Sequence, residues 1–144
     1  MKIVIASDHG GLRLKKELVE HLTKGGHEVE DIGTHTDASC DYPDFAHAVA
    51  KKVAAKEFER GILVCGTGVG MAIVANRHPG VRAVNCSDTF TAKLSRSHND
   101  ANVLCIGERV VGSGLGWEIV SAWVAEPAST DARHLQRRSK IEVA

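Results

Sequence analysis

The sequence lacks an apolar run long enough to cross a membrane, which takes about 18 residues or more. Its opening stretch, MKIVIASDHGG, is too short and turns polar too soon to be a secretory signal peptide. We therefore expect a cytoplasmic protein that has no membrane anchor.

An excess of charge of one sign is also missing. The 18 basic and 18 acidic side chains cancel, so the chain as a whole offers no basic surface to nucleic acid or to an acidic membrane. Any site for an anion must therefore be local.

Cysteines in CxxC spacing are absent as well. The four cysteines stand at 40, 65, 86 and 105, and the last three fall at or within apolar segments. In a reducing compartment this pattern favours free thiols over disulfide bridges.

The chain has enough apolar residues for one core. It contains 144 residues, of which 43% are hydrophobic, and domains of this size bury about 70% of the surface that the unfolded chain exposes. We expect one domain over residues 1–144, with a short helix in the polar tail at about 131–141.

Short β-branched runs alternate with amphipathic stretches along the chain. The expected strands, mostly buried on both faces, are 2–6, 28–33, 61–65, 81–86 and 102–107. The expected helices are 11–24, 43–57, 70–77, 88–98 and 113–125. Five successive βα units predict an α/β fold with a five-stranded, parallel, doubly wound sheet.

Ligands bind such sheets beyond the carboxyl ends of the strands. Asp8 and His9 follow the first expected strand, Cys65 ends the third, and Arg109 follows the fifth. We expect these groups to meet at one edge. His98 and Asn99 end a helix instead, so they reach this edge only if the helix ends there or a neighbouring subunit supplies them.

The loop CGTGVG at 65–70 has two interpretations. It can be a tight strand-to-helix turn that simply needs glycine. Alternatively, the backbone amides of Gly66, Thr67, Gly68, Val69 and Gly70 form a cradle for an anion or a developing oxyanion. It is not the dinucleotide motif GxGxxG, because Met71 stands where the third glycine belongs, and no Walker lysine follows.

Cys65 is likewise open to two interpretations. A cysteine in this position can be a small buried apolar residue. Its place just before a helix N-terminus favours instead a reactive thiolate. A tyrosine-phosphatase loop is excluded, since Met71 stands where the required arginine belongs.

Metal binding has weak support. His35, Asp37, Cys40 and Asp41 could gather, but they lack ligand spacing on a regular element. The histidines at 21, 27, 47 and 78 are interpreted as surface residues. Arg133 and Arg137 are four residues apart, so a helix projects them from one face. Such a pair is either a solvated charged face or a phosphate site.

Six motifs occur in order along the whole chain: SDHGG, DYPDFA, CGTGVGMAIVANR, LSRSHNDANVL, GERVVG and ARHLQRR. In these motifs the chain closely resembles the ribose-5-phosphate isomerase B family, which also contains galactose- and allose-6-phosphate isomerases. The resemblance implies a Rossmann-like αβα sandwich, a homodimer or dimer of dimers with shared active sites, no cofactor and no metal. It further implies an enzyme of the non-oxidative pentose phosphate pathway.

The resemblance also implies a role for each matching residue. Cys65 matches the base that moves a proton between carbons 2 and 1 through a cis-enediolate, and Thr67 matches the hydroxyl that assists the proton transfer between O1 and O2. His98 matches the ring-opening acid and base. Asp8 and Asn99 match sugar-binding positions, and the loop amides stabilise the oxyanion. Positions that contact the substrate, chiefly its phosphate, are matched by His9, Arg109, Arg133 and Arg137.

A second branch of the family carries a glutamate base at the position of Met71, so the methionine indicates the cysteine branch. Asp131 and Ala132 replace two glycines that many relatives have before the Arg-His pair, which can alter how the tail is presented. The expected reaction interconverts ribose 5-phosphate and ribulose 5-phosphate. Three alternatives remain open: an isomerase of a six-carbon sugar phosphate, a non-catalytic nucleotide- or phosphate-binding module, and a redox-sensing thiol protein.

Overall fold

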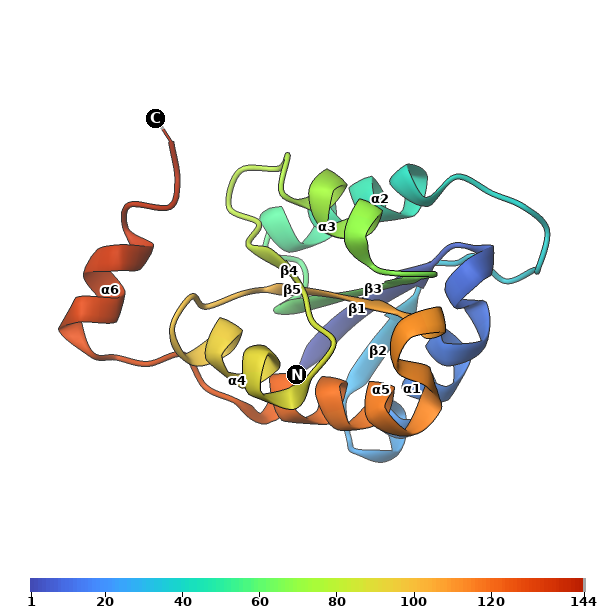
Figure 1. Cartoon of the computed structure of the whole chain (residues 1–144). Coiled ribbons are helices and arrows are strands. Elements are labelled where there is room, and N and C mark those ends of the chain that lie inside the picture. Colours follow the sequence, from blue (N-terminus) through green and yellow to red (C-terminus); the bar gives the residue numbers. More distant parts are fainter. Residues whose placement is uncertain (144) are drawn as a thin grey trace.

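A five-stranded parallel sheet forms the centre of the molecule (Figure 1). The computed structural model describes residues 1–143. The strands lie in the order β2-β1-β3-β5-β4. Their bounds are Lys2–Ser7 for β1, Glu28–Asp31 for β2, Arg60–Cys65 for β3, Ala83–Asn85 for β4 and Val103–Gly107 for β5. The predicted α/β fold with five parallel strands is confirmed.

Helices cover both faces of the sheet and complete a three-layer sandwich. Figure 1 shows α2 (Tyr42–Ala54) and α3 (Val69–Ala75) above the sheet. Below it lie α1 (Leu12–Lys24), α4 (Thr89–Ser97) and α5 (Glu108–Ala125). A short 3-10 turn, η1 (His9–Gly11), joins β1 to α1. No helix within residues 1–143 is both long enough and apolar enough to span a membrane.

Alternate residues of each central strand enter the two cores. Ile3 and Ile5 of β1 pack with α1, α4 and α5, whereas Val4 and Ala6 pack with α2 and α3. This matches the expectation that the strands are buried on both faces. The exceptions are the two edge strands: β2 alternates between exposed and half-buried residues, and β4 ends with a half-buried and an exposed residue.

Most helix boundaries lie within three residues of the prediction, and the start of the fifth helix differs most. The fifth helix begins at Glu108 rather than at 113, and Gly112 interrupts it with a φ of 66°. The left-handed backbone at Gly112, which glycine permits, breaks the regular helix. The residues before this break therefore lack the helical periodicity from which the helix was predicted. The tail helix α6 spans Ala132–Arg138, shorter than the predicted 131–141.

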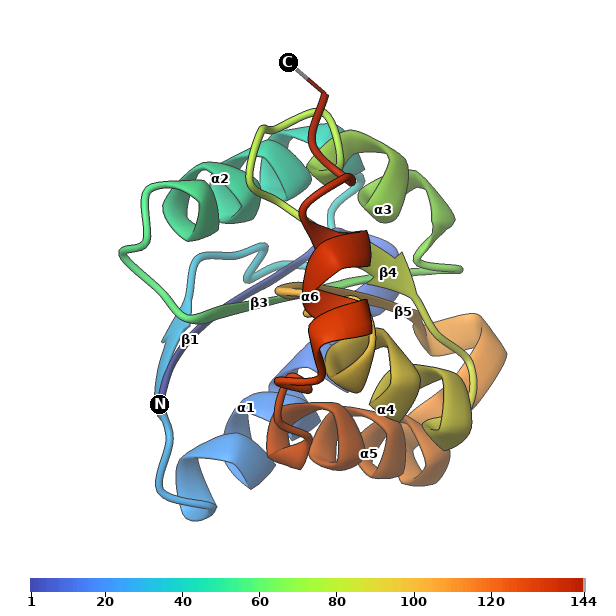
Figure 2. The same cartoon turned by 90° about the vertical axis from the view of Figure 1, so that its left-hand side faces the viewer.

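The helix α6 stands apart from the sandwich, beside the edge where the strands begin (Figure 1). Figure 2 shows it in front of the sheet, next to α4. The carboxyl ends of the strands lie at the other edge, where β1 leads into η1 and β5 into α5. The two edges are called the amino edge and the carboxyl edge below.

Candidate active site

Three strand ends meet at the carboxyl edge, as predicted. The Asp8 amide donates to the Val64 carbonyl at 3.2 Å, which joins the end of β1 to β3. The Arg109 amide donates to the Gly66 carbonyl at 3.1 Å, which joins the end of β5 to the same loop. Asp8, Cys65 and Arg109 are thereby brought together.

The loop after β3 turns one of its own amides onto the Cys65 thiol. The Gly68 N–H donates to Cys65 Sγ at 3.0 Å, and only 6% of Cys65 is exposed. Gly68 has a φ of 83°, a conformation that side-chain-bearing residues rarely adopt. A Cβ there would also lie 2.3 Å from Asn85 Nδ2. Since this N–H points at the sulfur, it stabilises negative charge that develops there.

The remaining loop amides form a smaller cradle than the sequence suggested. Besides Gly68, the Val69 amide is engaged within the chain, because it donates to Thr67 Oγ1 at 3.3 Å. Within residues 1–143 this leaves the amides of Gly66, Thr67 and Gly70 to bind a ligand. Three donors in one loop suit an anionic oxygen.

Two residues that sequence analysis missed hold this loop. Asn85 Nδ2 donates to the carbonyls of Thr67 and Cys105, each at 3.1 Å. Tyr42 lies against Gly70 so closely that a Cβ on Gly70 would be 2.6 Å from the tyrosine ring. Asn85 ends β4, so the rule on strand ends would have found it. Tyr42 lies in the motif DYPDFA, which carries no expected site residue.

The groups expected to bind phosphate flank the loop. The Arg109 side chain lies over Gly66, since a Cβ added to this glycine would be 3.3 Å from Arg109 Nη1. His9 Nδ1 accepts a hydrogen bond from the Cys40 amide at 3.2 Å. Only 8% of Asp8 is exposed, and its Oδ1 accepts a hydrogen bond from the Gly10 amide at 2.8 Å.

His98 and Asn99 lie at the opposite, amino edge. His98 is the residue that ends α4. Two residues later, Asp100 forms a 3.1 Å ion pair with Arg82, which directly precedes β4. The first of the two options left by the sequence is therefore wrong: α4 does not end at the carboxyl edge, because a helix between parallel strands returns to the start of the next strand.

The His98 ring stacks on His134 of α6, with ring centroids 4.2 Å apart and an interplanar angle of 16°. Only 7% of His134 is exposed. Its burial, together with the charges of His98 and Arg133, lowers the pKa of His134 below the usual 6.5. The exposed Arg133 and Arg137 lie on the same helix, so α6 gathers these cations beside His98.

The predicted site residues thus form two separate groups. The carboxyl-edge group contains Asp8, His9, Arg109 and the loop from Cys65 to Gly70. The amino-edge group contains His98, Asn99, Arg133 and Arg137. The sheet lies between the two groups within one chain.

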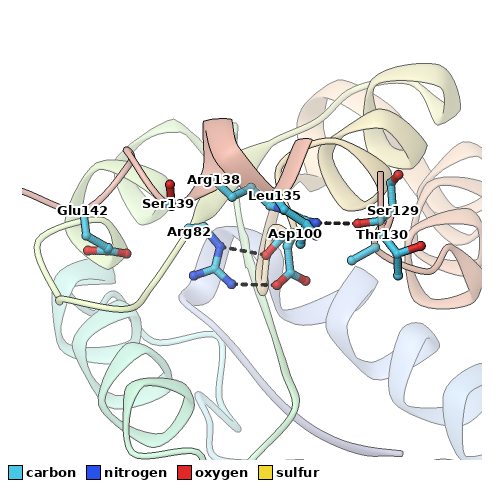
Figure 3. Close-up of a pocket in the computed structure, with 9 residues that line it drawn as sticks. Arg82, Asp100, Ser129, Thr130, Leu135, Arg138, Ser139 and Glu142 are labelled. Carbon is cyan, nitrogen blue, oxygen red and sulfur yellow. Dashed lines mark hydrogen bonds and ion pairs between the residues drawn. The ribbon is translucent and has the colours of Figure 1, made fainter. Parts of the chain in front are cut away.

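A hollow of about 490 Å³ separates α6 from the body of the protein (Figure 3). Arg138 bridges it by donating to the Ser129 carbonyl, and the Arg82–Asp100 ion pair forms its floor. None of the predicted site residues lines this hollow. It is therefore a gap behind the tail helix and not the candidate active site.

All four cysteines are free thiols, as predicted. Cys86 and Cys105 are buried away from solvent, and burial raises the pKa of Cys86 to about 11. Among residues 1–143, no three histidine, cysteine or acidic side chains group closely enough to hold a metal ion.

The fold and this site define a doubly wound α/β protein with a thiol and an anion-binding loop at the carboxyl edge, an arrangement suited to a small phosphorylated substrate. The chain belongs to the ribose/galactose isomerase family, whose sequence pattern it matches over residues 3–141.

Individual relatives are similar over nearly their whole length. Ribose-5-phosphate isomerase B of Escherichia coli is 50% identical over 140 residues, which covers 97% of this chain and 93% of the relative. The structure of ribose-5-phosphate isomerase B from Clostridium thermocellum is 50% identical, with a TM-score of 0.94, over 98% of this chain and 95% of that one. The Mycoplasma genitalium enzyme, solved with bound ribulose-5-phosphate, is 44% identical with a TM-score of 0.93, over 97% and 93% of the two chains.

Proposed function

We propose that this protein is a ribose-5-phosphate isomerase that interconverts ribose 5-phosphate and ribulose 5-phosphate, with Cys65 as the base. The observation that carries the assignment is the Cys65 thiol at the end of β3, which accepts the Gly68 N–H at 3.0 Å beside an open cradle of amides. The names and the bound sugar phosphate of the relatives support the substrate.

The proposed reaction moves one proton between two carbons. The Cys65 thiolate removes the proton from carbon 2 of the open-chain aldose, and the electrons of the C–H bond form the double bond of a cis-enediolate. The thiol then returns the proton to carbon 1, giving the ketose. Negative charge on the sugar oxygen is stabilised by the amides of Gly66, Thr67 and Gly70, while the Thr67 hydroxyl moves a proton between O1 and O2.

Met71 supports the cysteine branch. This side chain is fully buried in the core below the loop, and a thioether has no proton to exchange. The position that carries glutamate in the other branch therefore supplies no base here. Cys65 is the remaining group of suitable chemistry at the end of β3.

The other half of the site would come from a second copy of the chain. His98 opens the sugar ring, Asn99 binds the sugar, and Arg133 and Arg137 bind the phosphate, yet all four lie at the amino edge, across the sheet from Cys65. A homodimer that places the amino edge of one copy against the carboxyl edge of the other completes two such sites.

Replacing Cys65 with alanine tests the assignment. We expect turnover to fall by about 10² to 10⁴ or more, as for the loss of an acid or base catalyst. Exchange of the carbon-2 proton with deuterated solvent should stop as well. Circular dichroism should be unchanged, because the glycines and the surrounding core remain.

Cys86→Ala is the matched control, because it removes a thiol that lies 2% exposed in the core below the sheet. It should retain turnover. Near-normal proton exchange in Cys65→Ala would remove Cys65 from the role of base. A coupled assay with five- and six-carbon aldose phosphates, run on the wild type, tests the substrate, and faster turnover of a six-carbon sugar would contradict the proposal.

A further inference from the structure

One hydrogen bond to His9 defines which of its nitrogens carries a proton. The Cys40 amide, in the connection between β2 and α2, donates to His9 Nδ1 at 3.2 Å. The Cys40 Sγ lies 3.8 Å from the same nitrogen, and Cys40→Ala removes this thiol while keeping the amide. An accepting ring nitrogen carries no proton, so the neutral ring has its proton on Nε2. His9 can then offer Nε2–H as a donor to a phosphate oxygen.

The segment that presents the Cys40 amide runs from Gly33 to Asp41 and has no helix or strand of its own. Its beginning is fastened to the end of β1, just before His9. The Ser7 amide donates to the Gly33 carbonyl at 2.7 Å, and the Thr34 amide donates to the Ser7 carbonyl at 2.8 Å. The segment and His9 therefore share one anchor point.

An ion pair between a buried lysine and a partly exposed aspartate holds this anchor. The Lys15 side chain is fully buried, and its Nζ donates to Asp31 Oδ1 at 2.7 Å and to the Thr34 carbonyl at 2.5 Å. Asp31 Oδ1 also accepts the Gly33 amide at 3.0 Å. A lysine is almost never fully buried unless it is paired, and here its partners, Asp31 and Thr34, lie on either side of Gly33 in the sequence.

We infer that Lys15, Asp31 and the Cys40 amide are positioning residues that hold His9 as an Nε2–H donor for the substrate phosphate. Lys15 and Asp31 fix the start of the 33–41 segment, and the Cys40 amide at its far end fixes the ring. The consequence for phosphate binding rests on the proposed function, whereas the position of the His9 proton does not.

A comparison of the variants Cys40→Pro and Cys40→Ala tests the inference directly. Proline removes the backbone N–H and alanine keeps it. Long-range ¹H–¹⁵N spectra of ¹⁵N-histidine-labelled, ligand-free protein at about pH 8, where free imidazole is neutral, show which ring nitrogen carries the proton. The His9 signals are assigned by their loss in His9→Gln.

We expect the wild type and Cys40→Ala to show the Nε2–H form alone, and Cys40→Pro to show both forms. In Cys40→Pro the KM for the sugar phosphate should rise about three- to tenfold, as for one weakened hydrogen bond, with a smaller change in kcat. A wild-type His9 spectrum in Cys40→Pro overturns the inference. Intact turnover in Cys65→Ala would overturn the proposed function and leave this spectrum unaffected.

A second pair of variants tests the anchor without touching the segment itself. Lys15→Met combined with Asp31→Asn removes both charges, so that neither is left buried and unpaired. We expect mixed His9 forms and a raised KM in this double variant. Lys24→Met, an exposed lysine at the end of the same helix, should behave as the wild type. A folded double variant with a single Nε2–H form and an unchanged KM contradicts the role of the ion pair.

Discussion

The carboxyl-edge and amino-edge groups are built in different ways. The residues of the first lie at or just after the ends of β1, β3 and β5, and the backbone around them is packed tightly: a Cβ on Gly107 would lie 2.5 Å from Thr67 Cα. The second group lies on the two residues that follow α4, His98 and Asn99, and on a seven-residue helix outside the sandwich, held by the His98–His134 stack and a few hydrogen bonds.

This difference suggests a division of labour between the two groups. In the proposed mechanism, the tightly packed group carries the chemistry that needs exact placement, namely the thiol and the oxyanion donors. The more loosely attached group carries long cationic side chains that can reach a phosphate. Because the sheet separates the groups within one chain, the proposed active site is complete only when two copies meet.

Replacing both Arg133 and Arg137 with alanine should produce the largest effect on the amino-edge group. Two charge-assisted hydrogen bonds to phosphate would be lost, so we expect kcat/KM to fall about 100-fold or more. Steady-state kinetics and the melting temperature measure this. The melting temperature should stay constant, since both side chains are exposed, and Lys140→Ala serves as the control. An unchanged apparent affinity would move the phosphate to His9, Arg109 and the loop alone.

His98→Asn separates ring opening from isomerisation. Ribose 5-phosphate is mostly a closed ring, whereas ribulose 5-phosphate cannot close such a ring because its O5 carries the phosphate. We expect the initial rate with ribose 5-phosphate to fall about 10²-fold. The initial rate with ribulose 5-phosphate should fall much less, provided that the open aldose leaves and closes in solution. An equal loss in both directions, with a lower melting temperature, would assign His98 a structural role in the stack instead.

Lowering the pH should weaken the docking of the amino-edge group and leave the carboxyl-edge group unchanged. This is the smallest of the effects predicted for the comparison of the two groups. The pKa of His134 in the folded protein is lowered by burial, by His98 and by Arg133, so protonation favours the undocked or unfolded chain. The stabilisation is complete above the usual value of 6.5 and is lost as the pH falls through the lowered value. Between pH 7.5 and 5, the hydrogen-exchange protection factors of the α6 amides, which correct for the slower intrinsic exchange at low pH, should fall in the wild type.

The comparison variant for the pH effect is His134→Gln, which keeps a planar polar side chain without a titrating ring. Its melting temperature should depend less on pH than that of the wild type, by about 1–3 °C. The protection factors of the loop from Cys65 to Gly70 should be the same at both pH values. Identical pH dependence of the two proteins would show that His134 does not control the docking of α6.

The sequence predicted the carboxyl-edge group well, for a simple physical reason. Parallel strands place their carboxyl ends at one edge, so Asp8, Cys65 and Arg109 could be brought together from the β-branched runs that precede them. The strand positions and five of the helices followed from the same periodicity. That residues 1–144 form one domain stays a prediction.

Other features depended on contacts that no local pattern contains. The direction of the Gly68 amide depends on a φ of 83°, which the sequence only permits. The edge at which His98 lies depends on the path of α4, and its stack with His134 joins residues 36 positions apart, so helical spacing gave no sign of it. The exposure of β2 depends on the order of strands in the sheet, which alternation alone does not define.

Mixing two inactive variants tests most directly whether the two groups come from different copies of the chain. Cys65→Ala disables only the carboxyl-edge group, and His98→Asn only the amino-edge group. The two proteins are unfolded together, refolded at equal amounts and assayed with ribose 5-phosphate. In a mixed dimer, one of the two sites combines the intact Cys65 of one copy with the intact His98 of the other. We predict recovery of about a quarter of the wild-type activity, since half of the dimers are mixed and each has one intact site. Activity that stays at the level of the separate variants, in a sample shown by mass spectrometry to contain mixed dimers, would contradict a shared active site.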